Sequence, residues 1–328
     1  MKNVYILVFA LLLSSFSLGG EIEDRSEIGR KAKELMLHNS FSELESIAST
    51  YRDMEERTSS GLWKLTLFYG AFGDVSSSAR KDEKTWRELV KKADRWINTY
   101  PKSPTPYIVK ALVLKKEAWA IRGVGYSNTV AADAWKPFYE KIELSRNVLE
   151  ESKLISSEDP HWHSTMAEIA TIQAWDEVDF KKFTSQSFAK FPNYFQLYFS
   201  AMDYYTPKWR GDADRIEIFA TEIMERTKSK EGFGMYARIY WYASQSQFQG
   251  KLFEKSKVRW GIMSKGIDDV LHKFPDQWNV NNFAFFACLA QDKEKARKLI
   301  SMIENPPIQS AWLGSNENYE NCKKWSTY

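Results

Sequence analysis

Helical periodicity runs through nearly all of the chain after residue 26, and it limits the protein to a fold built from helices. The clearest case is residues 83–100, where apolar residues recur at steps of three and four and share one face. These residues are Trp86, Leu89, Val90, Ala93, Trp96, Ile97 and Tyr100. Alternating strand patterns are missing, and the 328 residues include few glycines (15) and prolines (10). An all-α protein is therefore expected.

The same periodicity predicts a series of helices with short connections, which favours antiparallel neighbours. The predicted helices cover residues 27–38, 41–56, 59–72, 83–100, 106–122, 131–153, 162–175, 178–191, 194–205, 213–228, 231–247, 256–273, 278–290, 293–304 and 316–325.

The first 20 residues have the pattern of a secretory signal peptide. Lys2 precedes an unbroken apolar run over residues 4–13, and small residues follow. A run of this length is too short to cross a bilayer, which needs about 20 residues. We expect cleavage after Gly19 or Gly20, export of residues 21–328 to the periplasm or beyond the cell, and no stable membrane insertion afterwards. An uncleaved anchor is the alternative.

Charge and cysteine content narrow the possible partners and the compartment. The formal net charge is +3, and basic and acidic residues interleave along the chain. Nucleic-acid binders usually carry a stronger or clustered basic excess, so no nucleic-acid partner is expected. Cys288 and Cys322 could form a disulfide in an oxidising compartment, or remain two separate buried thiols.

Three predicted helices end in an aromatic residue followed by proline, which cannot continue a helix. The pairs are Tyr100-Pro101, Phe191-Pro192 and Phe274-Pro275. Nine or ten residues after each proline the next helix carries a small residue that permits close packing: Ala111, Ala201 and Ala284. The same arrangement at three places predicts an α-solenoid, in which antiparallel helix pairs stack on their neighbours.

The stretch "FAFFACLAQDKEKARKLISMI" resembles a tetratricopeptide-type (TPR) unit, with a small-residue-rich first helix and Asp292 placed to cap the second. The spacing departs from a 34-residue TPR period, so the predicted repeats are degenerate and TPR-like. With "AWAIRGVGY", "YFQLYFSAMDYYTPKWRGD", "KVRWGI", "DDVLHKFP" and "NCKKW", residues 85–325 resemble a family of exported bacterial TPR-like proteins of unknown function. The resemblance implies a helical repeat fold and carries almost no functional information. We expect a single helical repeat domain over residues 21–328.

Two loops are predicted to contribute to partner binding. In "AIRGVGYSNTV" the glycines follow a helix, whereas phosphate-binding glycine loops follow a strand, so the stretch is interpreted as a helix end. Arg122 and Tyr126 lie beside it. Trp209 and Arg210 lie in a second break of the helical pattern and belong to residue types enriched at binding hot spots. The tripeptide "RGD" at 210–212 is a known adhesion motif, but a tripeptide also occurs often by chance.

Other stretches permit both a structural and a functional interpretation. "DPHWHS" at 159–164 could contribute His161 and His163 to a zinc site, but a helix start after Asp159 with Trp162 buried is favoured. The aromatic stretch at 235–248 could stack on sugars, but core packing is favoured. We therefore predict no metal and no cofactor.

Sequence motifs of metalloproteases, serine hydrolases and nucleotide-binding enzymes are missing. The predicted function is a non-catalytic scaffold that binds a protein or peptide partner in a TPR-like superhelical groove. Two alternatives remain: a glycan- or small-ligand-binding module that uses exposed tryptophan and tyrosine, and an enzyme with an unfamiliar site.

Overall fold

The computed structural model describes residues 20–75, 82–123, 125 and 127–327. This part of the chain is all-α, and its only β-type pairing is an isolated bridge between Arg57 and Trp63. The helices are α1 (Glu21–Leu37), α2 (Phe41–Asp53), α3 (Lys64–Val75), α4 (Glu83–Thr99), α5 (Thr105–Arg122), α6 (Trp135–Glu151), α7 (Lys153–Ser156), α8 (Pro160–Ile172), α9 (Glu177–Lys190), α10 (Phe195–Met202), α11 (Ala213–Glu231), α12 (Gly234–Ala243), α13 (Leu252–Lys255), α14 (Trp260–Lys273), α15 (Gln277–Leu289), α16 (Lys293–Ile300) and α17 (Asn316–Thr327).

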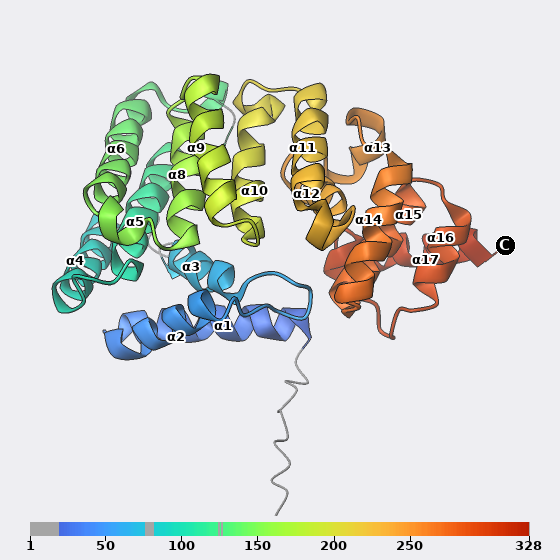
Figure 1. Cartoon of the computed structure of the whole chain (residues 1–328), viewed down its shortest axis with the longest axis horizontal. Helices are drawn as coiled ribbons and strands as arrows, with labels where there is room; N and C mark the ends of the chain where they lie inside the picture. The colour runs from blue at the N-terminus through green and yellow to red at the C-terminus, as the bar shows by residue number, and fades with distance from the viewer. Residues whose placement is uncertain (1–19, 76–81, 124, 126, 328) are drawn as a thin grey trace, which may run out of the picture.

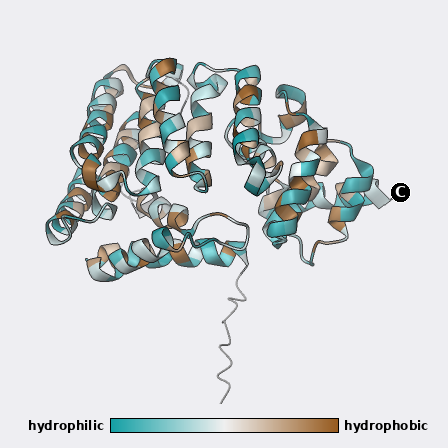
Figure 2. Ribbon diagram, viewed as in Figure 1, coloured by the Kyte–Doolittle hydropathy of each residue, from teal (hydrophilic) through white to brown (hydrophobic). Residues whose placement is uncertain are grey.

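The helices from α4 onward stand side by side in an arc (Figure 1). Helices α5, α8, α10, α12 and α15 are buried on most sides, and we call them the inner helices. The outer helices α4, α6, α9, α11, α14 and α16 each bury a single face. Each inner helix packs on outer neighbours, as α5 does on α4 and α6. Hydrophobic residues recur between hydrophilic ones along the outer helices (Figure 2). At helical spacing this gives each outer helix one apolar face.

The N-terminal helices α1 and α2 lie crosswise to the arc (Figure 1). The loop between α2 and α3 connects them to the rest of the molecule. Its Ser60 carbonyl oxygen accepts hydrogen bonds from Arg238 Nη2 of α12 (2.7 Å) and from Asn279 Nδ2 of α15 (3.2 Å). Arg57 of the same loop donates to the Asn193 carbonyl oxygen before α10 (3.1 Å). Segments more than 130 residues apart in sequence are thus joined by one loop.

A second connection joins the N-terminal helices to the start of α8. The Asp159 side chain is fully buried, forms an ion pair with Arg52 (2.9 Å), and accepts a hydrogen bond from the Tyr69 hydroxyl (2.7 Å). Its other oxygen caps α8 by accepting from the His161 backbone N–H (2.8 Å). A buried carboxylate is tolerated here because each oxygen has a partner and one partner is charged. The predicted helix start after Asp159 is confirmed, and Trp162 is buried.

The three aromatic–proline pairs adopt one backbone conformation. Tyr100 and Phe191 both have φ −128° and ψ 62°, and Phe274 has φ −135° and ψ 73°. In each case the aromatic residue's N–H donates to the carbonyl four residues earlier and ends the helix. The small residues predicted for close packing, Ala111, Ala201 and Ala284, are fully buried.

Several predicted helices have different limits in the structure, and α1 begins at Glu21 where the prediction started at residue 27. The prediction of helix over 59–72 was wrong at its start, because α3 begins at Lys64 and the preceding residues form the connecting loop with Gly61 at φ 90°. The prediction over 231–247 was wrong at its end. There α12 stops at Ala243 and a π-helical turn, Ser244–Phe248, follows.

Cys288 at the end of α15 and Cys322 in α17 are joined by a disulfide, with Cα atoms 5.9 Å apart. This bond holds the last helix against the preceding helix pair. No helix in the described ranges combines the length and apolar character needed to cross a bilayer.

Gly61 offers a test of how much the connecting loop contributes to stability. A Cβ at this position would lie 2.8 Å from the Phe274 ring and 2.9 Å from Arg238 Nη2, at a φ that side chains rarely adopt. We expect Gly61→Ala to lower the free energy of unfolding by about 2–3 kcal/mol.

The matched control is Gly29→Ala in α1, where a Cβ would meet nothing within 4 Å. It should raise the free energy of unfolding by about 0.5–1 kcal/mol, because alanine favours helix. Urea titrations followed by far-UV circular dichroism measure both. Equal effects of the two substitutions would contradict the role given to the loop.

Candidate functional site

Helices α8, α10 and α12 each have one partly accessible side, and its residues are mostly polar. Helix α8 shows this most clearly, since nearly all of its residues are buried and Glu168 is the exception between Pro160 and Ile172. Polar and aromatic residues of α5, α10 and α12 continue the same side. We call this set the inner strip: Lys115, Glu168, Gln196, Phe199, Asp203 and Tyr242.

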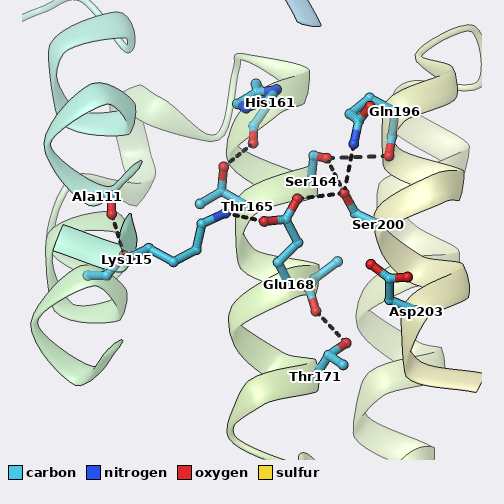
Figure 3. Close-up of polar contacts among 12 residues, drawn as sticks. Ala111, Lys115, His161, Ser164, Thr165, Glu168, Thr171, Gln196, Ser200 and Asp203 are labelled. Atoms are coloured by element: carbon cyan, nitrogen blue, oxygen red, sulfur yellow. Dashed lines mark hydrogen bonds and ion pairs between the residues drawn. The ribbon is translucent and has the colours of Figure 1, made fainter. Parts of the chain in front are cut away.

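Glu168 is held between two helices (Figure 3). One carboxylate oxygen forms an ion pair with Lys115 Nζ of α5, and the other accepts a hydrogen bond from Ser200 Oγ of α10 (2.8 Å). The Glu168 side chain is 30% exposed, so it is fixed by its partners while water still reaches it. Such a carboxylate is positioned before any ligand arrives, which lowers the entropic cost of binding.

A hydroxyl and amide network beneath the strip supports Glu168. Because Ser200 gives its only hydroxyl proton to Glu168, it must accept from its other neighbours. Those neighbours are Ser164 Oγ of α8 (2.8 Å) and Gln196 Nε2 of α10 (3.2 Å). Ser164 and Ser200 are buried, whereas Gln196 is partly accessible. The network therefore links Glu168 to an amide that water can reach (Figure 3).

Asp203 adds a second carboxyl group at the end of α10. Burial raises its pKa to about 7, a hydrogen bond from the Tyr242 hydroxyl opposes the rise, and the charge of Glu168 adds to it. The hydroxyl of Tyr242 donates to Asp203 Oδ2 at 3.0 Å, and burial raises the pKa of Tyr242 well above 10, so the phenol remains a donor. The Tyr242 ring stacks on Phe199, with ring centroids 5.3 Å apart.

In the first predicted binding loop, residues 120–130, Arg122 contacts other residues of the protein. The Arg122 guanidinium lies over the rings of Trp119 (5.0 Å to the centroid) and Trp135 (4.9 Å). Its Nη1 donates to the carbonyl oxygens of Gly123 (2.9 Å) and Gly125 (3.0 Å), which holds the loop against the end of α5. The helix ends at Gly123, as predicted. Arg122 thus has an architectural role in the described contacts.

The second predicted loop lies against the first. The Trp209 ring meets Trp119 edge to face, with centroids 6.2 Å apart, so Trp119 connects Trp209 to Arg122. Arg210 follows at φ 81° and is exposed. Tyr126, the fourth predicted residue, lies outside the described residues. The structure brings three of the four predicted residues to one end of α5.

The two histidines of the "DPHWHS" stretch are both buried and hydrogen-bonded. His161 Nδ1 bonds to the Tyr194 hydroxyl (2.7 Å), and His163 bonds to Ser187 Oγ (2.8 Å). Burial lowers the pKa of His161 to about 3 and that of His163 to about 4, so both rings are neutral near pH 7. The described residues contain no group of histidine, cysteine, aspartate and glutamate side chains that could hold a metal ion.

Sequence reasoning missed the inner strip. Its signal was a lone charged residue within an otherwise apolar helix, such as Glu168 in "TMAEIATI". The partners of that residue come from other helices and have no local pattern. The aromatic stretch at 235–248 was expected in the core, and most of α12 is buried there.

Asp203 predicts a pH-dependent contribution to stability. Between the unfolded pKa of 3.8 and the folded value of about 7, the folded chain keeps a proton that the unfolded chain has released. Stability therefore falls as pH rises through this window, and the penalty is complete above pH 7. Asp203→Asn removes this penalty. The free energy of unfolding of the variant should therefore exceed that of the wild type by about 2 kcal/mol near pH 8 and equal it near pH 4.

Urea unfolding of both proteins at the two pH values measures this difference. The buried histidines titrate in both proteins, so their contribution cancels when the variant is compared with the wild type. A difference that is the same at both pH values would mean that Asp203 has the same pKa in the folded and unfolded chains.

Comparison with known proteins gave no match to a family model, to a curated protein or to a solved structure. The interpretation of the site therefore depends on the residues and contacts of this chain.

Proposed function

We propose that this chain is an exported, non-catalytic scaffold that binds an extended peptide segment of a partner protein along the inner strip. The observation that carries the proposal is the single partly accessible side of α8, α10 and α12. That side presents fixed hydrogen-bonding groups, Glu168 and Gln196 among them, beside the aromatic rings of Phe199 and Tyr242. Peptide main chains need both donors and acceptors, and aromatic rings supply contact area at low entropic cost.

The proposal includes a TPR-like solenoid of degenerate helix pairs, formed as one domain over residues 21–328. The recurring helix end supports it, since Tyr100 and Phe191 share the same φ and ψ. A further match lies six residues after each of these prolines: Tyr107 donates to the Pro101 carbonyl (3.0 Å), and Tyr198 donates to the Pro192 carbonyl (3.0 Å). Two helix pairs with the same boundary chemistry are typical of a repeated unit.

Export to the periplasm or beyond the cell belongs to the same proposal. The disulfide between Cys288 and Cys322 supports it, because such bonds persist in oxidising compartments. The predicted signal peptide, residues 1–20, lies outside the described residues apart from Gly20.

Binding is favoured over catalysis by the state of the two carboxyl groups. A carboxyl group with a pKa near 7, as in Asp203, suits proton transfer. A hydrolytic pair would also need a second carboxylate free to act as base or nucleophile. Both oxygens of Glu168 are already bound, one by Lys115 and one by Ser200.

The proposal predicts that substitutions on the inner strip remove a partner that substitutions elsewhere leave bound. The tagged protein is captured from gently crosslinked native cells, and enriched proteins are identified by mass spectrometry against an unrelated exported control. The test variant combines Gln196→Ala and Phe199→Ala, which change only partly accessible residues. We expect the enriched partner to fall by about tenfold or more, as for residues at a binding hot spot.

The matched control combines Lys182→Ala and Gln186→Ala on the exposed face of α9. It should capture the partner as the wild type does, and circular dichroism should show all three proteins equally helical. The proposal fails if no protein is enriched, or if the α9 variant loses the partner while the inner-strip variant retains it.

A further inference from the structure

A pocket of about 240 Å³ lies between the end of α12, the helix α15 and the segment before α17. Aromatic side chains form part of its wall: Trp241 of α12 with Phe285 and Phe286 of α15. The other wall carries neutral polar groups, mainly the amides of Gln245, Gln249 and Asn282. None of its described lining residues is charged. The pocket shares no residue with the inner strip.

The aromatic wall is rigid. Trp241 meets Phe283 edge to face, with ring centroids 5.2 Å apart, and Phe285 meets Trp312 in the same way at 5.5 Å. Trp241 and Phe285 are each 9% exposed, so their rings are packed on one side and reach the pocket on the other. A preformed wall of this kind is common in sites for small molecules.

The amides of the polar wall are available to a ligand. Gln245 and Gln249 form no side-chain hydrogen bond with another described residue. Asn282 is 5% exposed and uses its Nδ2 to donate to the Trp278 carbonyl oxygen (2.8 Å), which leaves its Oδ1 as an acceptor. Side-chain amides offer a donor and an acceptor on the same group, which suits a ligand with neighbouring hydroxyls.

The backbone around the pocket is held in uncommon conformations. The π-helical turn Ser244–Phe248 leads into Gln249, which has φ 50° and ψ −137°, a region that normally requires glycine. Across the pocket Leu313 has φ 55° and ψ 31°, which is left-handed and unusual for leucine. π-Helical turns and backbone strain concentrate at functional sites. Here both occur in residues that line one pocket.

We propose that this pocket binds one uncharged sugar ring, as a monosaccharide or as a unit of a neutral glycan. A pyranose has a C–H face that packs on aromatic rings and an edge of hydroxyls that bond to amides. The absence of charged lining residues selects against uronic acids and amino sugars with a free amine. The size agrees with a single ring, because pockets for drug-sized ligands start at about 300 Å³.

Saturation-transfer difference NMR with the full chain tests this directly. The probes are the methyl glycosides of glucose, galactose, mannose and N-acetylglucosamine, with glucuronate and glucosamine as charged counterparts. We expect saturable binding of at least one neutral glycoside in the millimolar range, and at least tenfold weaker binding of both charged sugars.

Gln249→Gly is the decisive variant. It removes the amide and relieves the backbone, so sugar affinity should fall at least tenfold while the melting temperature rises. The matched control is Gln291→Gly, which has φ 58° but does not line this pocket. Its melting temperature should also rise, but its affinity for the sugar should equal that of the wild type. Gln245→Leu provides a second loss of an amide without a change at a strained position.

Three outcomes would overturn the inference: no saturable binding of any neutral glycoside, equal binding of the charged sugars, or equal affinity loss in the Gln249 and Gln291 variants. Partner capture by Gln249→Gly separates this inference from the scaffold proposal. If Gln249→Gly loses sugar binding but still captures the partner, the scaffold proposal is unaffected. If it loses only the partner, the sugar-binding inference is unaffected.

Discussion

The rest of the structure depends on one backbone carbonyl, that of Ser60. It accepts hydrogen bonds from Arg238 and Asn279, two buried residues of different inner helices. Arg238 forms no ion pair with any described carboxylate, and burial lowers its pKa to about 10. Its charge is balanced by this carbonyl and by the ring faces of Phe195 and Phe274. Without the loop, a buried guanidinium would lose its main acceptor, which is a severe cost. The N-terminal helices are therefore part of the core.

The same rule, that buried polar groups need partners, produces the inner strip. A helix packed on most sides can carry a charged residue where neighbouring helices supply its partners and water still reaches it. Glu168 occupies such a position because Lys115 and Ser200 complete its hydrogen bonds from neighbouring helices. Asp203 accepts a hydrogen bond from Tyr242, and burial raises its pKa to about 7. The strip therefore combines an ion-paired carboxylate with a buried carboxyl that releases its proton near neutral pH.

The all-α class could be predicted from sequence because each outer helix shows its buried face as a local period, as Trp86, Leu89, Ala93 and Trp96 do in α4. Helix caps were also local, since Asp212 and Asp292 accept hydrogen bonds from N–H groups three residues ahead.

The connecting loop was not predictable from sequence. The stretch "SSGLWKLTLF" keeps a helical period, but the donors to its Ser60 carbonyl oxygen lie more than 170 positions away. The candidate site was missed for the same reason. Arg122 and Trp209 were noted separately, and only the fold shows that Trp119 lies between them.

The crosswise position of α1 and α2 has a consequence for the order in which the molecule can fold. A chain is synthesised from its N-terminus, so the first helices and the Ser60 loop emerge early. Their acceptors and donors, from Asp159 to Asn279, emerge much later. Because contacts between distant segments form only after both exist, the first helices cannot complete their packing until most of the chain has been synthesised. The first segment to be synthesised is thus among the last to complete its packing, and it must stay soluble until then.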